Sequence, residues 1–183
     1  MIAAGVIYFN CMSITKKEIQ DLLIFGLSHS EPIDGLPIGV TIFQVFLSLK
    51  PILKGKLYWG SLREAYTMSD NLFNYRFDLR AAFMSEEENR DSLMSKKERM
   101  VLNTLPDKVK IYRGVTTDEI DSKNFGLSWS LKKEVAEFFA FKYRRNYDTS
   151  SSLKTVIEIE VNKNEIIAYF QDREEEEIIY LSK

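Results

Sequence analysis

The chain has 183 residues, enough for one ordinary domain or one domain with a sizeable extension, and its 45% hydrophobic and 28% charged residues are typical of a globular protein. The net charge is −2. It is spread evenly, because residues 1–106 carry 12 basic and 12 acidic groups and residues 107–183 carry 13 and 15. This balance gives no general attraction to nucleic acid.

Cys11 and His29 are the only cysteine and the only histidine. One residue of each kind excludes an intramolecular disulfide, a Cys/His zinc cluster and a two-histidine metal site, and it disfavours a Ser-His-Asp triad. We interpret His29 as a solvated loop residue. Any chemistry then has to rest on carboxylates, hydroxyls, arginine and backbone groups, and we expect no metal.

Two apolar stretches could suggest membrane insertion. Residues 1–12 lack a preceding basic group and are short, so we read them as a buried strand or helix rather than a signal peptide. Residues 38–53 are interrupted by polar side chains and fall short of a membrane span. We therefore expect a cytoplasmic protein with no membrane segment.

The region up to residue 106 is predicted to be mainly helical. Capping boxes begin at Thr15 and Ser95, each with glutamate three residues later, and helices are expected to follow both. Residues 28–39 hold two prolines and two glycines and predict a loop. Residues 40–49 suit a helix or a strand, of which we favour the helix. Residues 61–68 and 70–84 are predicted to be helices.

The pattern changes after residue 106, which we take as the boundary between a helical N-terminal region (1–106) and a β core (107–183). Strands are predicted at residues 109–115, 126–131, 155–161, 166–170 and 177–181, because apolar and β-branched residues alternate or cluster there. Residues 132–145 predict one amphipathic helix, and residues 146–152 a polar loop.

Three short motifs in the β core carry candidate chemistry. Arg113-Gly114 ends a predicted strand, where a guanidinium can grip phosphate oxygens bidentately and glycine lets a ligand approach the backbone. Ser128-Trp129-Ser130 places two hydroxyls on one side of a strand and the indole on the other. Taken singly, an Arg-Gly pair is more often a surface arginine before a turn glycine. A Ser-x-Ser segment is more often an ordinary strand with alternating faces.

The third motif is the acidic run at residues 174–177, which leads directly into Ile178-Ile179-Tyr180-Leu181. Such a run is usually a solvated turn, but here Glu177 begins a buried strand. Glu175 points the same way if the extended geometry reaches back to it. One carboxylate of such a pair can stabilise a developing positive charge while its neighbour acts as a base.

In this order, the three motifs resemble the arginine–serine–glutamate signature of mono-ADP-ribosyltransferases of the cholera-toxin-like and ectoenzyme type. The resemblance covers roughly residues 108–181. Residues 126–130, followed by residues 136–140, also look like small phage and prophage proteins of this fold. The resemblance implies an α+β protein in which a helical N-terminal half packs on a split β-sandwich whose cleft binds NAD.

The resemblance also implies residue roles. Arg113 would contact the NAD phosphate and ribose, the Gly114 backbone would hold the nicotinamide amide, and Ser128 would orient the catalytic glutamate, with Ser130 beside it in the cofactor-binding set. Phe139 would stack on nicotinamide; its alternative is a core residue. The catalytic residues would be Glu177, at the breaking bond, and Glu175, whose presence implies an arginine acceptor.

Several alternatives stay open. Trp129 stands where the family usually has threonine, and Glu174-x-Glu176 fits the glutamate motif as well as Glu175-x-Glu177. We prefer Glu177 because the family's catalytic glutamate directly precedes the hydrophobic strand. The competing functions are a catalytically silent NAD-binding module and a protein-interaction module, for example a phage-encoded inhibitor of a host protein. We expect a protein acceptor, with a nucleic-acid acceptor as the alternative.

Overall fold

The computed structural model describes residue 17 and residues 40–69, 72–143, 154–171 and 175–182. Several predicted features lie outside these residues: the apolar start, Cys11, the capping box at Thr15, His29 in its loop, and the polar loop at 146–152. The fold described below is that of the remaining chain.

The described residues between 40 and 104 form helices joined by short turns. These α-helices and 3₁₀ turns are α2 (Val40–Leu49), α3 (Gly55–Thr67), η1 (Leu72–Tyr75), α4 (Arg76–Phe83), η2 (Arg90–Leu93) and α5 (Lys96–Thr104). The helix favoured for residues 40–49 is confirmed. The helix predicted for residues 70–84 is instead a 3₁₀ turn followed by a shorter α-helix.

The capping box predicted at Ser95 is confirmed and begins α5. The Ser95 hydroxyl accepts a hydrogen bond from the Glu98 amide at 3.3 Å, and the Ser95 amide donates to the Glu98 carboxylate at 2.7 Å. Two amides of the first turn that have no partner within the helix are thereby satisfied.

The second part of the chain forms an antiparallel sheet of five strands in the order β3-β1-β2-β5-β4. The strands are β1 (Lys108–Thr116), β2 (Ser128–Ser130), β3 (Lys154–Asn162), β4 (Ala168–Phe170) and β5 (Glu177–Ile179). Shorter elements connect them: α6 (Thr117–Ser122), α7 (Lys133–Glu137), the π-helical segment η3 (Phe138–Lys142) and the 3₁₀ turn η4 (Lys163–Glu165). The protein is therefore of the α+β class.

The helix predicted for residues 132–145 is present from Lys133 to Lys142, but it is not α-helical throughout, and residues 144 and 145 lie outside the described residues. The α-helix ends at Glu137, and residues 138–142 continue it as a π-helix. Helix α6 was not predicted. It begins with a capping box in which the Thr116 hydroxyl accepts from the Glu119 amide at 3.3 Å and the Glu119 carboxylate accepts from the Thr116 amide at 3.2 Å.

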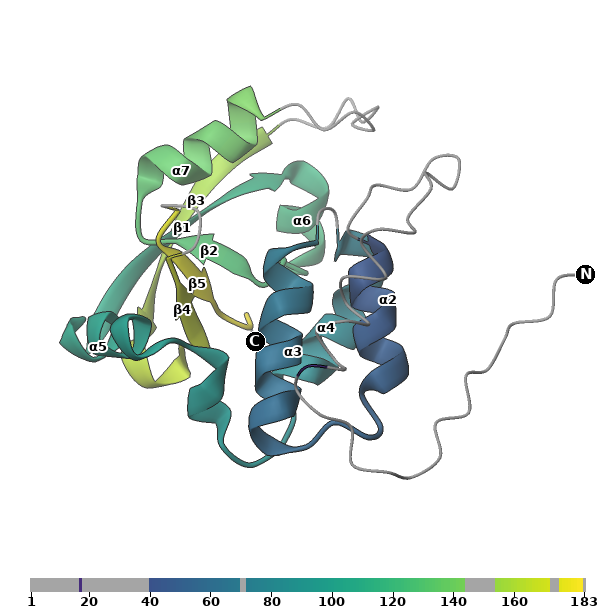
Figure 1. Ribbon diagram of the computed structural model, residues 1–183. Helices are drawn as coiled ribbons and strands as arrows, with labels where there is room; N and C mark the ends of the chain where they lie inside the picture. The colour runs from purple at the N-terminus through teal and green to yellow at the C-terminus, as the bar shows by residue number, and fades with distance from the viewer. Residues whose placement is uncertain (1–16, 18–39, 70–71, 144–153, 172–174, 183) are drawn as a thin grey trace, which may run out of the picture.

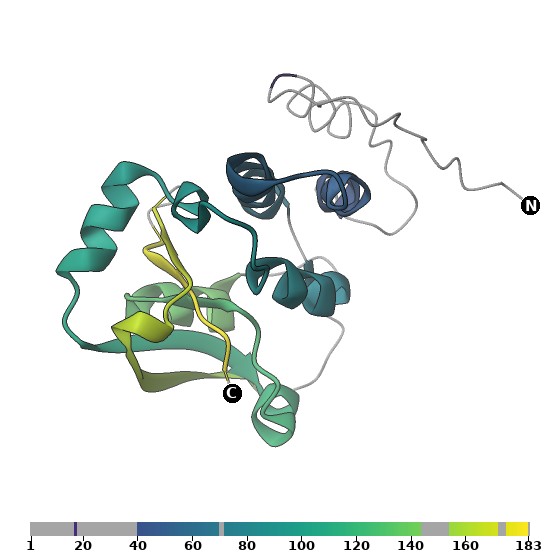
Figure 2. The same ribbon diagram turned by 90° about the horizontal axis from the view of Figure 1, so that it is seen from below.

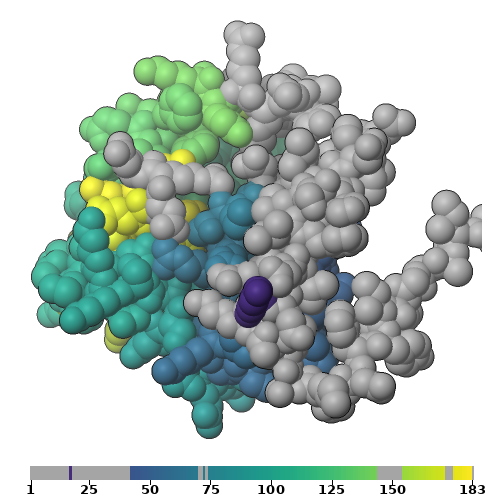
Figure 3. Space-filling view, viewed as in Figure 1, coloured from purple at the N-terminus to yellow at the C-terminus, as the bar shows by residue number. Residues whose placement is uncertain are grey.

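The sheet is covered on both faces, and strand alternation assigns each residue to one of them. Ala168, Phe170 and Ile179 belong to a core formed with α2, α3 and α4, whereas Tyr169, Ile178 and Trp129 belong to a second core to which α5 contributes. Figures 1 and 2 show α2, α3 and α4 grouped beside the sheet and α5 apart from them. In Figure 3 the C-terminal strand (yellow) lies between the α7 segment (green) and the α5 segment (teal).

The sheet has a narrow junction between β1 and β2. The register pairs Tyr112 with Ser130 and no further residues of these two strands, whereas β1 and β3 pair along their whole length. Continuing the antiparallel register would bring Gly114 opposite Ser128. In place of that backbone pairing, the Ser128 carbonyl accepts a hydrogen bond from the Arg113 guanidinium at 2.6 Å.

A buried ion pair connects the helices to the sheet. Arg63 of α3 donates to both carboxylate oxygens of Glu98 in α5, at 2.6 and 2.9 Å, and Glu98 also accepts from the amide of Gln171 just after β4, at 3.0 Å. The Glu98 side chain is only 3% exposed. Burial alone would raise the pKa of Glu98, but hydrogen bonds from Arg63, Ser95 and Gln171 outweigh it and lower the pKa to about 2.

This pKa predicts a loss of stability in acid. Glu98 has a folded-state pKa below its usual 4.5, so its contribution is complete above pH 4.5 and disappears as the pH falls towards 2. That contribution is on the order of 3 kcal/mol. We expect Glu98→Gln to lower the free energy of unfolding at pH 7 and to flatten its decline between pH 5 and pH 2, as measured by urea denaturation at each pH. Glu160→Gln, at an exposed position of β3, is the control; equal pH profiles for the two variants would contradict this role.

Candidate functional site

The centre of the candidate site is the carboxylate of Glu177, the first residue of β5. The hydroxyl of Ser128 in β2 and the phenol of Tyr66 in α3 both donate to Glu177 Oε1, each at 2.5 Å. The register of β2 and β5 explains the contact between Ser128 and Glu177, because Ser130 pairs with Glu177 and Ser128 pairs with Ile179. Ser128 and Glu177 therefore share the face of the sheet that α3 covers.

Tyr66 is held tightly in this position. Its ring packs edge-on against Phe83, with ring centroids 5.3 Å apart, and is tilted against Phe170 at 5.9 Å. Burial and the neighbouring Glu177 carboxylate raise the pKa of Tyr66 well above 10, while Ser128 and Arg113 lower it by less. The phenol therefore stays protonated and remains a hydrogen-bond donor at ordinary pH.

Arg113 reaches the same place from β1. Besides its bond to the Ser128 carbonyl, its guanidinium donates to Glu119 Oε1 at 2.9 Å, and both side chains are about one-fifth exposed. The Nε–H of Arg113 is buried without a hydrogen-bond partner among the described residues. Ser128 thus connects the predicted arginine and the predicted glutamate, through its carbonyl on one side and its hydroxyl on the other.

Two glycines make room for this arrangement. A Cβ at Gly126 would lie 2.4 Å from Arg113 Nη2, so the missing side chain lets the guanidinium pass. A Cβ at Gly114 would lie 2.7 Å from the Ala136 carbonyl and 2.9 Å from Ala140. Close packing of α7 and η3 on β1 therefore requires the glycine at 114 in the structure, independently of any ligand.

Ser130, by contrast, is buried, and its hydroxyl forms hydrogen bonds with backbone groups. Its hydroxyl donates to the Glu175 carbonyl at 2.7 Å and accepts from the Lys132 amide at 2.9 Å. The Leu131 amide donates to the Glu176 carbonyl at 3.1 Å. These bonds attach the end of β2 to residues 175 and 176, which we call the acidic turn.

The acidic turn is not extended. Glu176 has a φ of 45°, in the left-handed region, which costs a residue with a side chain about 1–2 kcal/mol. Its carboxylate pairs with Lys132 Nζ at 3.0 Å. The strand alternation predicted to align Glu175 with Glu177 therefore stops at Glu177, and the turn sets the direction of Glu175. Glu174, the other member of the alternative register, lies outside the described residues.

Phe139 belongs to a separate aromatic group in η3. Its ring lies 5.5 Å from Phe138 and 5.3 Å from Tyr143, between centroids. The structure thus connects Arg113 to Glu177 through Ser128, whose carbonyl accepts from the arginine and whose hydroxyl donates to the glutamate, and places Ser130 and the Glu175 backbone nearby. It places Phe139 on the helical segment that packs against β1.

Sequence analysis missed Tyr66 and Glu119. Glu119 carried a readable signal, because Thr116 and Glu119 have the spacing of a capping box. Tyr66 carried none, since only the packing of α3 on the sheet brings residues 66 and 177 together.

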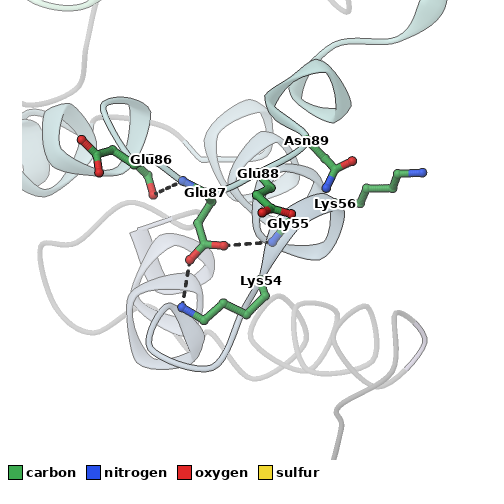
Figure 4. A pocket seen from close by; sticks show the side chains of 8 residues that line it. Lys54, Gly55, Lys56, Glu86, Glu87, Glu88 and Asn89 are labelled. Carbon is green, nitrogen blue, oxygen red and sulfur yellow. Dashed lines mark hydrogen bonds and ion pairs between the residues drawn. The ribbon is translucent and has the colours of Figure 1, made fainter.

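A separate polar hollow lies at the start of α3, the opposite end of that helix from Tyr66 (Figure 4). Glu87 there accepts from the Gly55 amide at 3.0 Å and from Lys54 Nζ at 2.9 Å, and Gly55 has a φ of 50°. The carboxylate thus satisfies an amide at the beginning of α3, which accounts for its place in the fold.

No family model, curated protein or solved structure matches this chain. Among the described residues, no cluster of three or more His, Cys, Asp or Glu side chains is suited to hold a metal ion. Within the same part of the chain, none of the helices is long and apolar enough to cross a membrane.

The partly buried Arg113–Glu119 pair should be energetically coupled. In a double-mutant cycle with Arg113→Ala and Glu119→Ala, we expect a coupling free energy of about 1–2 kcal/mol, because both groups are charged, hydrogen-bonded and largely shielded from solvent. Chemical denaturation of the four proteins measures it. The exposed pair Lys110–Glu158, with side chains 60% and 45% exposed, is the comparison and should give a smaller value. Equal coupling in the two pairs would refute the idea that burial strengthens the Arg113 contact.

Proposed function

We propose that the protein is a mono-ADP-ribosyltransferase that transfers ADP-ribose from NAD to an acceptor, expected to be a protein arginine, and releases nicotinamide. The observation that carries this proposal is that β1, β2 and β5 bring Arg113, Ser128 and Glu177 into one hydrogen-bonded group. These are the three residues on which the resemblance to this enzyme family rests.

Two further observations support the proposal. The single registered pair between β1 and β2 makes the junction between these strands narrow within the continuous sheet, and the split sandwich that the resemblance implies would divide the sheet at such a junction. Arg113 also holds a buried Nε–H with no partner in the described structure, so this donor is available to a ligand; the Nε1–H of Trp129 in the core is in the same condition. A phosphate oxygen is an acceptor suited to the Arg113 Nε–H once the guanidinium exchanges Glu119 for the ligand.

In this proposal NAD supplies a glycosidic bond whose cleavage releases nicotinamide. Arg113 holds the negatively charged phosphates. Glu177, whose carboxylate is fixed by two hydroxyl donors, stabilises the positive charge that develops on the ribose carbon. Glu175 takes the proton of the attacking acceptor. Ser130 and Lys132 contact the acidic turn, so their role is to fix the backbone that directly precedes Glu177.

The first functional prediction concerns Glu177. Glu177→Gln keeps the shape of the side chain but removes the charge, so we expect nicotinamide release to fall by at least 100-fold while NAD binding persists. Nicotinamide can be followed by chromatography and NAD binding by calorimetry. Glu160→Gln serves as the control and should match the wild type. Full activity of Glu177→Gln would contradict the proposed catalytic role of Glu177 and, with it, the proposed transferase function.

The second functional prediction concerns Glu175. Glu175→Gln should suppress modification of arginine but spare slow NAD hydrolysis, because water is less dependent than a guanidinium on a base at that place. Mass spectrometry of acceptor proteins measures the first activity and nicotinamide release without acceptor measures the second. Equal loss of both would refute separate roles for the two glutamates.

A further inference from the structure

We propose that Tyr66 is a positioning residue for Glu177, so that the helical region contributes a side chain to the proposed transferase site. This inference rests on the proposed function and deepens it. It gives α3 a role that no sequence motif indicated.

Two hydroxyl donors hold one oxygen of the Glu177 carboxylate. Tyr66 Oη and Ser128 Oγ both lie 2.5 Å from the same oxygen, Glu177 Oε1. One donor comes from a helix and the other from the adjacent strand, so rotation of the carboxylate would break at least one short charge-assisted bond. A carboxylate held in this way is preorganised for a charge that develops at a fixed point.

The Tyr66 donor is itself held in place by its neighbours. The Tyr66 ring is packed between Phe83 and Phe170. One helical turn earlier, Arg63 is anchored by two bonds to Glu98. A group that opens and closes a site needs freedom to move, whereas these contacts fix the phenol, so the structure favours positioning over gating.

The alternative is that Glu177 merely satisfies a buried phenol. Tyr58, two turns earlier on α3, shows what such a case looks like: its side chain is buried, and its hydroxyl donates to the Ala82 carbonyl at 2.9 Å. Tyr58 therefore offers a control, since Tyr58→Phe and Tyr66→Phe each remove one hydrogen-bonded hydroxyl from the same helix and keep the ring.

The experiment compares wild type, Tyr66→Phe and Tyr58→Phe by two measurements. The first is steady-state nicotinamide release. We expect Tyr66→Phe to lower kcat roughly 10-fold to 100-fold with KM for NAD within about twofold, as for loss of a residue that orients a catalytic group. Tyr58→Phe should keep the wild-type kcat, although both variants lose similar stability, about 1 kcal/mol.

The second measurement does not depend on turnover. In protein labelled with ¹³C at the glutamate carboxyl carbons, the Glu177 signal is identified by its absence from Glu177→Gln. It should move in Tyr66→Phe and stay in place in Tyr58→Phe. If both variants leave the signal and kcat unchanged, or change them equally, the positioning role is overturned. A higher kcat in Tyr66→Phe would overturn it in favour of an inhibitory contact.

The two proposals can fail separately. If the wild-type protein releases no nicotinamide from NAD, the proposed function fails, and the Glu177 signal alone decides whether Tyr66 holds that carboxylate. If the wild type is active and Glu177→Gln is not, but Tyr66→Phe behaves as Tyr58→Phe, only the inference about Tyr66 fails.

Discussion

The ion pair between Arg63 and Glu98 is the constraint on which the rest of the arrangement depends. Glu98 binds α3 through Arg63, begins α5 through Ser95 and holds the chain after β4 through the Gln171 amide. Buried ion pairs often add little net stability compared with apolar packing, but losing one partner is costly. The value of this pair is therefore positional, because it fixes α3 against the sheet at the level where the proposed site is assembled.

The sheet supplies the second half of the arrangement through its register. Pairing Ser130 with Glu177 places the hydroxyls of β2 and the first carboxylate of β5 on one face, whereas Trp129 and Ile178 fill the opposite core. A slip of one residue would reverse both faces. The same alternation that buries the core thus turns the Glu177 side chain, at the start of β5, towards Ser128.

Sequence patterns predicted the elements better than the contacts between them. The capping box at Ser95 and the alternation at residues 155–161 are local, and both led to correct elements. The π-helical widening at residues 138–142 and the left-handed Glu176 have no local signature that periodicity reveals. The motifs identified Arg113, Ser128 and Glu177 as candidates, but Tyr66 lies 111 residues from Glu177 and depends on tertiary packing.

The close packing of α7 and η3 on β1 brings Gly114 against Ala136 and Ala140, which lie more than 20 residues further along the sequence. The Ala136 carbonyl and the backbone and Cβ of Ala140 lie where a side chain at residue 114 would have to go. A larger residue at position 114 would therefore collide with helix backbone that cannot move aside as a flexible side chain could. The packing thus requires the glycine after Arg113 whether or not a ligand binds there, so an Arg-Gly pair marks this helix–strand packing before it marks any activity.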